Sequence, residues 1–235
     1  MQSVMLASLA VGLGAAAQAV TGFGFALVCG PFLVVAMGPV DGVRLTILLS
    51  CAINVLVMLR EVRSVLVRDG ALLLIPAVIA TPVAAWLLHP LDHRLLMVAA
   101  GLLTLASTLA LACGLRLHRL RGTAGAAITG TISAAMNVIG GLSGPAVALY
   151  SLNAEWPPAS TRPTLQAYGL GLNLVALAAL GLPALSAAAP LFIGLIAGGT
   201  IGVLLAGRLP RSGVRRMALL LAACGGLFAV IRGLG

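Results

Sequence analysis

Two glycine-rich segments interrupt otherwise apolar sequence, and their residue types suit the binding of a small anion. Glycine, amide and hydroxyl residues followed by Gly-Pro are poor material for a continuous membrane helix. A break leaves unpaired backbone N–H groups at the start of the next helix, where partial positive charge favours an anion. The segments are Gln18-Ala-Val-Thr21-Gly22-Phe23-Gly24, closed by Gly30-Pro31, and Asn137-Val-Ile-Gly140-Gly141-Leu-Ser143-Gly144-Pro145.

Breaks in matching positions of two half-chains indicate a transport site, because lipid tolerates irregular backbone only around protein or a water-filled cavity. Asn54 and Asn173 lie in the spans after the breaks, and hydrogen bonding between helices explains them as well as a role in the site does. Ser50, Gln166 and Tyr168 are further polar residues at membrane depth. The predicted substrate-binding residues are Gln18, Thr21, Gly22, Phe23, Gly24, Gly30, Pro31, Asn54, Asn137, Gly140, Gly141, Ser143, Gly144, Pro145 and Asn173.

These polar candidates are all neutral, which favours an anion over a cation. The five carboxylates of the chain fall in loops or at span ends, so none is placed for a deep proton relay or as a sodium ligand. The chain has no HExxH, GxSxG or P-loop motif, so we expect neither an enzyme nor ATP-driven transport. Its four cysteines lack metal spacing, and we expect no metal or cofactor.

The composition is that of a membrane protein with many helices. Hydrophobic residues make up 61% of the chain and charged residues 8%, with a mean hydropathy of +1.15. Few residues are aromatic, so helix contacts must rely on small side chains, as in Gly194, Gly198 and Gly202 or Gly122, Ala126 and Gly130. The apolar runs are 3–20, 25–37, 43–59, 71–88, 95–115, 123–138, 145–153, 164–182, 188–206 and 217–233.

Two of these runs, 25–37 and 145–153, are too short to cross a bilayer. At about 1.5 Å per residue they reach roughly 20 and 14 Å, against about 30 Å of hydrocarbon. Each follows a glycine-rich break, so we interpret both as returning arms of re-entrant hairpins. Ten full crossings would give the same arrangement of loops, and loop charge alone does not separate the two.

The positive charge of the chain, formally +9, predicts orientation in the membrane rather than nucleic-acid binding. All fourteen basic residues are arginines, and ten of them lie in the loops 60–68, 116–121 and 208–216. Hairpins put these three loops on one face, which the positive-inside rule assigns to the cytoplasm. A single crossing at each break would instead divide the clusters six against four. Arg44 and Arg162, near span starts, either anchor the protein at the interface or draw anions toward it.

The order of polar landmarks predicts two membrane repeats, residues 1–120 and 121–235, within one integral domain. Asp41 and Arg44 before the span with Asn54 parallel Arg162 before the span with Asn173. The offset between the halves drifts from 114 to 119 residues when Gly30-Pro31 is matched with Gly144-Pro145. One hairpin and three full crossings per half place the halves in inverted orientations. The predicted fold is therefore all-α and polytopic, with two inverted repeats.

The chain resembles the sulfite exporter TauE/SafE family of membrane permeases. The resemblance rests on the Gln18–Gly24 pattern with Gly30-Pro31 and its recurrence at 140–145, and it extends over essentially the whole chain. It implies transport of sulfur-containing anions such as sulfite, sulfonates or sulfoacetate across the bacterial inner membrane. The chain departs from the usual pattern at Phe25, where a further small residue is common, and the second break has Asn137; both would change the pocket.

We therefore expect a multi-pass inner-membrane permease whose partners are a small anionic substrate and the lipid bilayer. The sequence leaves a homo-oligomer open and gives no sign of a nucleic-acid partner. Two alternatives are a channel-like conduit for a small solute and a non-transporting membrane scaffold. A channel would show flux that does not saturate, whereas a scaffold would tolerate polar substitutions in both breaks. The absence of any sizeable soluble loop argues against the scaffold.

Overall fold

The computed structural model describes residues 2–59, 61–115, 120–206, 208 and 210–235, and this part of the chain is helical without strands. Each predicted apolar run coincides with one α-helix; the boundaries differ by at most six residues, at the starts of the eighth and tenth helices. A short 3₁₀ turn, Val62–Ser64, lies between the third and fourth helices. The helices are α1 (Gln2–Thr21), α2 (Phe25–Met37), α3 (Pro39–Met58), α4 (Val67–Leu88), α5 (His93–Ala112), α6 (Gly122–Gly140), α7 (Gly144–Asn153), α8 (Pro158–Leu180), α9 (Leu185–Leu205) and α10 (Arg211–Leu234).

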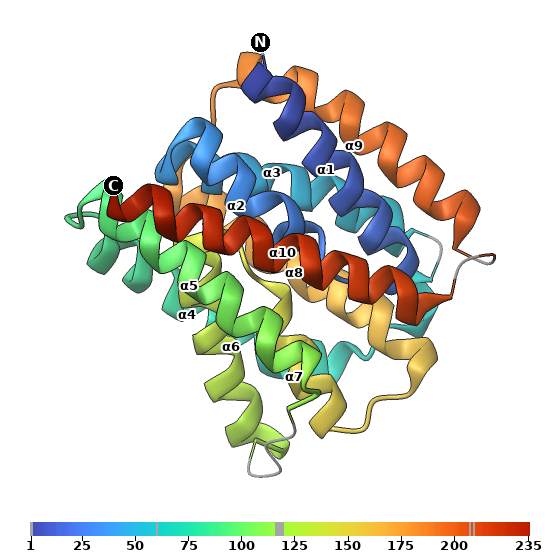
Figure 1. The fold of residues 1–235 in the computed structure, drawn as a ribbon. Coiled ribbons are helices and arrows are strands. Elements are labelled where there is room, and N and C mark those ends of the chain that lie inside the picture. The colour runs from blue at the N-terminus through green and yellow to red at the C-terminus, as the bar shows by residue number, and fades with distance from the viewer. Residues whose placement is uncertain (1, 60, 116–119, 207, 209) are drawn as a thin grey trace.

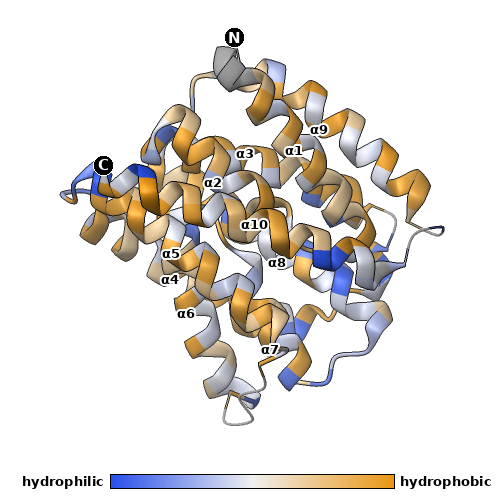
Figure 2. Cartoon of the chain, viewed as in Figure 1, coloured by the Kyte–Doolittle hydropathy of each residue, from blue (hydrophilic) through white to orange (hydrophobic). Residues whose placement is uncertain are grey.

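The outer surface of the helices is apolar, as a lipid-facing surface must be. Figure 2 shows hydrophobic colour along the helices and hydrophilic colour mainly in loops and at helix ends. Large side chains such as Trp86, Ile193 and Leu220 are exposed. Within the described part of the chain, six helices are long and apolar enough to cross a membrane by themselves: α3, α4, α5, α8, α9 and α10. The prediction of an all-α, multi-pass membrane protein is confirmed.

Both short helices turn back along the helix that precedes them. A Cβ added to Gly14 of α1 would lie 2.9 Å from the carbonyl oxygen of Phe25, so α2 runs beside α1. In the second hairpin, the hydroxyl of Tyr150 donates to the carbonyl of Gly122, at the opposite end of α6, over 3.2 Å. Glycines with positive φ make both turns possible. The depth of these hairpins in a bilayer stays a prediction.

The expectation that Gly30-Pro31 would break the helix is wrong. Pro31 lies inside α2, and the helix continues for six residues beyond it. Proline removes one N–H donor from the helix, but α2 accommodates this loss, and both Gly30 and Pro31 are buried. Pro31 packs near Gly225 of α10. Gly144-Pro145, by contrast, opens α7, where a proline without an N–H removes no intrahelical hydrogen bond.

Small residues let helices from the two half-chains pack closely, as the GxxxG pattern predicts. Gly194, Gly198 and Gly202 of α9 lie directly on the backbone of α1, and the two helices run side by side in Figure 1. Gly130 of α6 makes the matching contact with Leu73 of α4. α10 lies along α5, also visible in Figure 1. The first helix of each half-chain is thus packed against the fourth helix of the other.

Helix positions recur along the chain at a nearly constant interval. α2 and α7 begin at residues 25 and 144, and α3 and α8 at 39 and 158, both 119 apart. α5 and α10 begin at 93 and 211, which is 118 apart. This constancy corrects the drifting offset of the sequence comparison, because Gly30-Pro31 lies in mid-helix and is not the counterpart of Gly144-Pro145.

Candidate functional site

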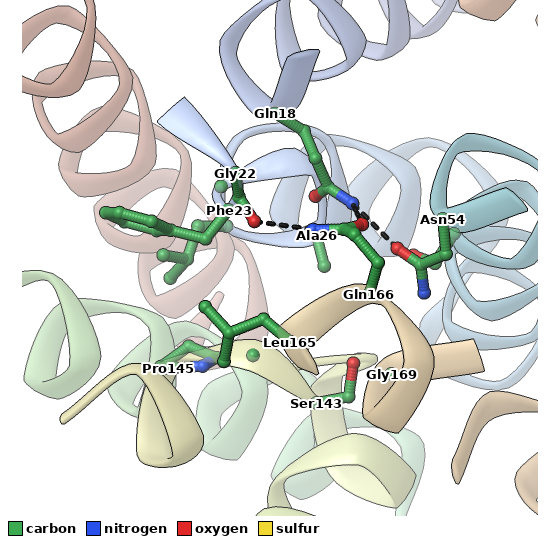
Figure 3. A pocket seen from close by; sticks show the side chains of 14 residues that line it. Gln18, Gly22, Phe23, Ala26, Asn54, Ser143, Pro145, Leu165, Gln166 and Gly169 are labelled. Carbon is green, nitrogen blue, oxygen red and sulfur yellow. Dashed lines mark hydrogen bonds between the residues drawn. The ribbon is translucent and has the colours of Figure 1, made fainter. Parts of the chain in front are cut away.

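A small cavity lies where the two breaks meet, between α3 and α8. Its volume is about 40 Å³, enough for a few water molecules. None of the fourteen described residues that line it is ionisable, and Figure 3 shows polar side chains of α1, α3 and α8 converging on it. The lining residues are Gln18, Gly22, Phe23, Gly24, Ala26, Leu27, Ser50, Asn54, Ser143, Gly144, Pro145, Leu165, Gln166 and Gly169.

The amide of Gln18 organises the first break. Its nitrogen donates to the side-chain oxygens of Asn54 (2.7 Å) and Gln166 (2.9 Å), from α3 and α8 (Figure 3). Its oxygen accepts the N–H of Phe25, the first residue of α2, over 3.1 Å. One buried side chain therefore joins four helices, and each of its hydrogen bonds is made away from bulk water, where such bonds are strong.

Two residues of α8 hold the turn between α1 and α2. Gln166 donates to the carbonyl of Gly22 over 2.6 Å, so this carbonyl does not face the cavity unpaired. Arg162 donates to the carbonyl of Ala19 near the end of α1 (2.7 Å), and its guanidinium also lies 3.5 Å from a carboxylate oxygen of Glu61. A cation at the C-terminal end of a helix is electrostatically favourable. Arg162 thus acts as a contact of the first break rather than as a free interfacial anchor.

In the second break, the bond between two amides recurs, but no bond from an amide to the first turn of the following helix does. Asn137 donates to Asn173 over 3.1 Å, and these residues are 36 apart, as are Gln18 and Asn54. The oxygen of Asn137 and the nitrogen of Asn173 are buried without a partner. The hydroxyl of Ser133 donates to the carbonyl of Ser143 over 2.7 Å and holds the turn.

Unused hydrogen-bond donors face the cavity from α3 and from the second break. The hydroxyl of Ser50 is buried and has no hydrogen-bond partner. The nitrogen of Asn54 points away from Gln18 in Figure 3, toward the side where Ser143 lies. Gly169 lies beside Asn54 and Ser143, and a Cβ added to it would be 2.9 Å from the side-chain nitrogen of Asn54. The cavity is therefore lined by neutral donors, which suit an anion.

The structure brings together about half of the predicted substrate-binding residues. The other predicted residues lie close by without lining the cavity. Thr21 uses its hydroxyl within the turn, donating to the carbonyl of Ala17. Gly30 and Pro31 are in the middle of α2; Asn137, Gly140 and Gly141 belong to the second break and Asn173 to α8, but none of these four lines the cavity. Those that line the cavity are Gln18, Gly22, Phe23, Gly24, Asn54, Ser143, Gly144 and Pro145.

Six lining residues were absent from the predicted set. Ser50 and Gln166 carried a usable signal, because polar residues at membrane depth are functional candidates. Gly169 carried none, since glycines recur throughout this chain and only the fold places this one beside Asn54. The remaining three, Ala26, Leu27 and Leu165, are apolar and resemble any other residue of a membrane helix.

Comparison with protein families identifies the chain. The model of the sulfite exporter TauE/SafE family matches residues 6–229. The chain belongs to this family. No curated protein and no solved structure matches it. TauE/SafE proteins are membrane transporters, so membership agrees with the apolar helical architecture.

Proposed function

We propose that this TauE/SafE protein is an inner-membrane permease that binds a small sulfur oxyanion or organosulfonate in the cavity between its helix breaks. The observation that carries the proposal is the lining of that cavity. It holds hydroxyl and amide donors and the start of α7, but no carboxylate that would serve a cation. Neutral donors and a helix N-terminus together stabilise an oxyanion. That the anion contains sulfur is inferred from the family description, sulfite exporter.

We further propose that residues 1–120 and 121–235 are inverted repeats. Corresponding helices run in opposite directions where they pack: Arg44, early in α3, lies near Gly181 after the end of α8. In the second pair, Arg94 at the start of α5 lies near Gly233 at the end of α10. An axis in the membrane plane produces this relation. The basic segments 60–68, 116–121 and 208–216 then face the cytoplasm; Arg68 lies at the start of α4 and the segment from Arg211 on lies in α10, and Arg60, Arg116 and Arg119 are outside the described residues.

Counterflow in liposomes tests the transport proposal. The purified protein is reconstituted with sulfite, sulfate, thiosulfate, methanesulfonate or acetate inside the vesicles, and uptake of the labelled external anion is followed. We expect saturable counterflow with at least one sulfur oxyanion and none with acetate. Flux that does not saturate would indicate a channel. A complete lack of flux in correctly folded protein would contradict transport of these anions and favour the scaffold.

A pair of glycine variants tests the location of the site. A Cβ added to Gly144, a residue that lines the cavity, meets nothing within 4 Å, so the Gly144→Leu side chain starts in open space beside the proposed site. Gly213→Leu, near the start of α10, is the matched control because it also has room and lies away from the cavity. We expect counterflow to fall at least tenfold in Gly144→Leu and to persist in Gly213→Leu. Equal activity in both variants would contradict this location.

A further inference from the structure

We propose that the two breaks have different roles: Gln18 occupies the N-terminus of α2, and the transported anion binds at the N-terminus of α7 with Ser50, Asn54 and Ser143 as side-chain donors. This inference rests on the proposed function and refines it. In the proposed function both breaks contribute equally to the site; here the anion is bound by the second break and the first break is occupied by Gln18.

The N-terminus of α2 already has an acceptor. The amide oxygen of Gln18 accepts the N–H of Phe25 over 3.1 Å, in the position where an oxygen of a bound anion would lie. The nitrogen of the same amide is used twice, by Asn54 and Gln166. A substrate would have to displace a buried side chain with all of its bonds made. Such a displacement costs the desolvation of every group left unpaired.

The N-terminus of α7 has no such acceptor. Asn137 stands 119 residues after Gln18 and takes its place in the second break, but its side chain is one methylene shorter. Its amide oxygen is buried without a partner instead of accepting the N–H of Gly144. Gly144 begins α7 and lines the cavity, and the space around it is open. The helix end with an exposed positive dipole is therefore the one that faces the cavity unoccupied.

A second feature of the cavity independently indicates a ligand on this side. Ser50, one helical turn before Asn54, is only 5% exposed and lines the cavity, and its buried hydroxyl lacks a hydrogen-bond partner. A buried donor without a partner is costly unless a ligand or water satisfies it. The side-chain oxygen of Asn54 accepts a hydrogen bond from Gln18, and its nitrogen points toward the side of Ser143 without a partner.

Gly169 keeps the space between these donors open. A Cβ added to it would lie 2.9 Å from the nitrogen of Asn54 and 3.7 Å from the hydroxyl oxygen of Ser143. A methyl group would thus occupy the place where an anion could touch both donors. The chemistry fits a compact oxyanion head with several oxygens, because the hydroxyls, the amide and the helix N-terminus approach it from different elements.

The test measures the concentration of sulfite or methanesulfonate that gives half-maximal counterflow. Gly169→Ala should raise it at least tenfold. Gly171→Ala is the matched control: it lies two residues further along α8, with a similar close contact, 2.8 Å, to the flexible end of Leu74. It should leave the value unchanged. Ser50→Ala should raise the value about tenfold, the loss of one hydrogen bond to a charged ligand.

Asn137→Gln tests the asymmetry directly. We expect the longer amide to accept the N–H of Gly144, as Gln18 accepts that of Phe25, and so to compete with the anion. The half-maximal concentration should then rise while the protein stays monodisperse in size-exclusion chromatography. Wild-type affinity in folded Ser50→Ala, Gly169→Ala and Asn137→Gln would overturn the assignment of the anion to α7. If the wild-type protein moves no anion of the panel, the proposed function fails and this assignment fails with it.

Discussion

The two helix breaks have similar sequences, but the protein holds them differently. In the first, two glycines adopt left-handed φ values, Gly22 at 87° and Gly24 at 113°, and the Gln18 amide makes three hydrogen bonds. In the second, only Gly141, at 71°, is left-handed, and Asn137 makes one bond. The two amide side chains differ by one methylene. The longer one, Gln18, accepts the first N–H of the following helix, whereas the shorter one, Asn137, leaves that N–H available.

The two short helices also differ in how tightly they are packed, α2 more tightly than α7. α2 is packed against α10, with Phe32 and Pro31 close to Gly225. α7 is three residues shorter and borders an apolar cavity of about 230 Å³ between α5 and α6. The comparison teaches that two hairpins of similar sequence are held differently: the first is packed against α10 and joined to α3 and α8 by the Gln18 amide, and the second borders open space.

The largest expected effect is the removal of the Gln18 amide. Gln18→Ala leaves the Phe25 N–H and the oxygens of Asn54 and Gln166 without their partner, and buried groups left unpaired cost about 1–3 kcal/mol each. We expect the free energy of unfolding, measured by titration of detergent-solubilised protein with SDS, to fall by about 3 kcal/mol or more.

The matched variant in the second break is Asn137→Ala, which removes a single bond to Asn173. It should lower the free energy of unfolding by about 1 kcal/mol. Equal losses in the two variants would contradict the difference between the breaks, since that difference rests on the number of bonds each amide makes.

Much of the fold was predictable because membrane helices are constrained by length and polarity. The run 25–37 coincides with α2, and 145–153 differs from α7 by one residue. The polar landmarks Gln18 and Asn54 also marked the site, because a buried amide in lipid needs a partner. The sequence did not reveal that this partner is the other amide, since only tertiary packing brings α1 and α3 together.

The prediction of the site failed where the direction of a side chain determines whether the residue lines the cavity. Asn137 and Asn173 are carboxamides with the same spacing as Gln18 and Asn54 and bond to each other in the same way, yet neither of them lines the cavity. Gly30-Pro31 looked like a helix break because proline usually ends a helix, but packing in the middle of α2 overrides this tendency. Gly169 contributes empty space, a property that no local pattern records.

A second comparison concerns the backbone of the two turns. Gly24→Ala places a side chain at a φ of 113° with only ordinary contacts nearby, so strain of about 1–2 kcal/mol is expected. Gly144→Ala occupies open space at the start of a helix and should leave stability unchanged or slightly raised. Unfolding in SDS measures both.

Gly38→Ala is the reference for this pair. Gly38 has a φ of 85°, a Cβ there meets nothing within 4 Å, and the residue lies outside both breaks. Its ψ of 163° lies in a region that is essentially restricted to glycine, so its loss should be at least as large as that of Gly24→Ala. A cost for Gly144→Ala as large as the other two would show that the second turn is as strained as the first.

The arginines near the two breaks should differ by a smaller amount. Arg162→Gln loses the bond to the Ala19 carbonyl and the contact with Glu61, both partly buried, and should cost about 1–2 kcal/mol. Arg44→Gln loses only an exposed pair with Asp41, 3.4 Å apart, which is worth about 0–1 kcal/mol. Glu61→Gln should reproduce part of the Arg162→Gln loss, and a loss after Arg44→Gln of the same size would contradict the comparison.

The smallest effect concerns packing around the short helices, and its sign should differ between them. Ala110→Leu on α5 adds atoms to the apolar cavity beside α7, and a handful of dispersion contacts at about 0.1–0.2 kcal/mol each should stabilise the protein by up to about 1 kcal/mol. Gly225→Ala adds a methyl 2.9 Å from the ring of Phe32 beside α2, so crowding should outweigh the gain in helix propensity and cost about 1 kcal/mol. If both substitutions shift SDS unfolding in the same direction, α7 is packed as tightly as α2, and the freedom attributed to the second hairpin has no structural basis.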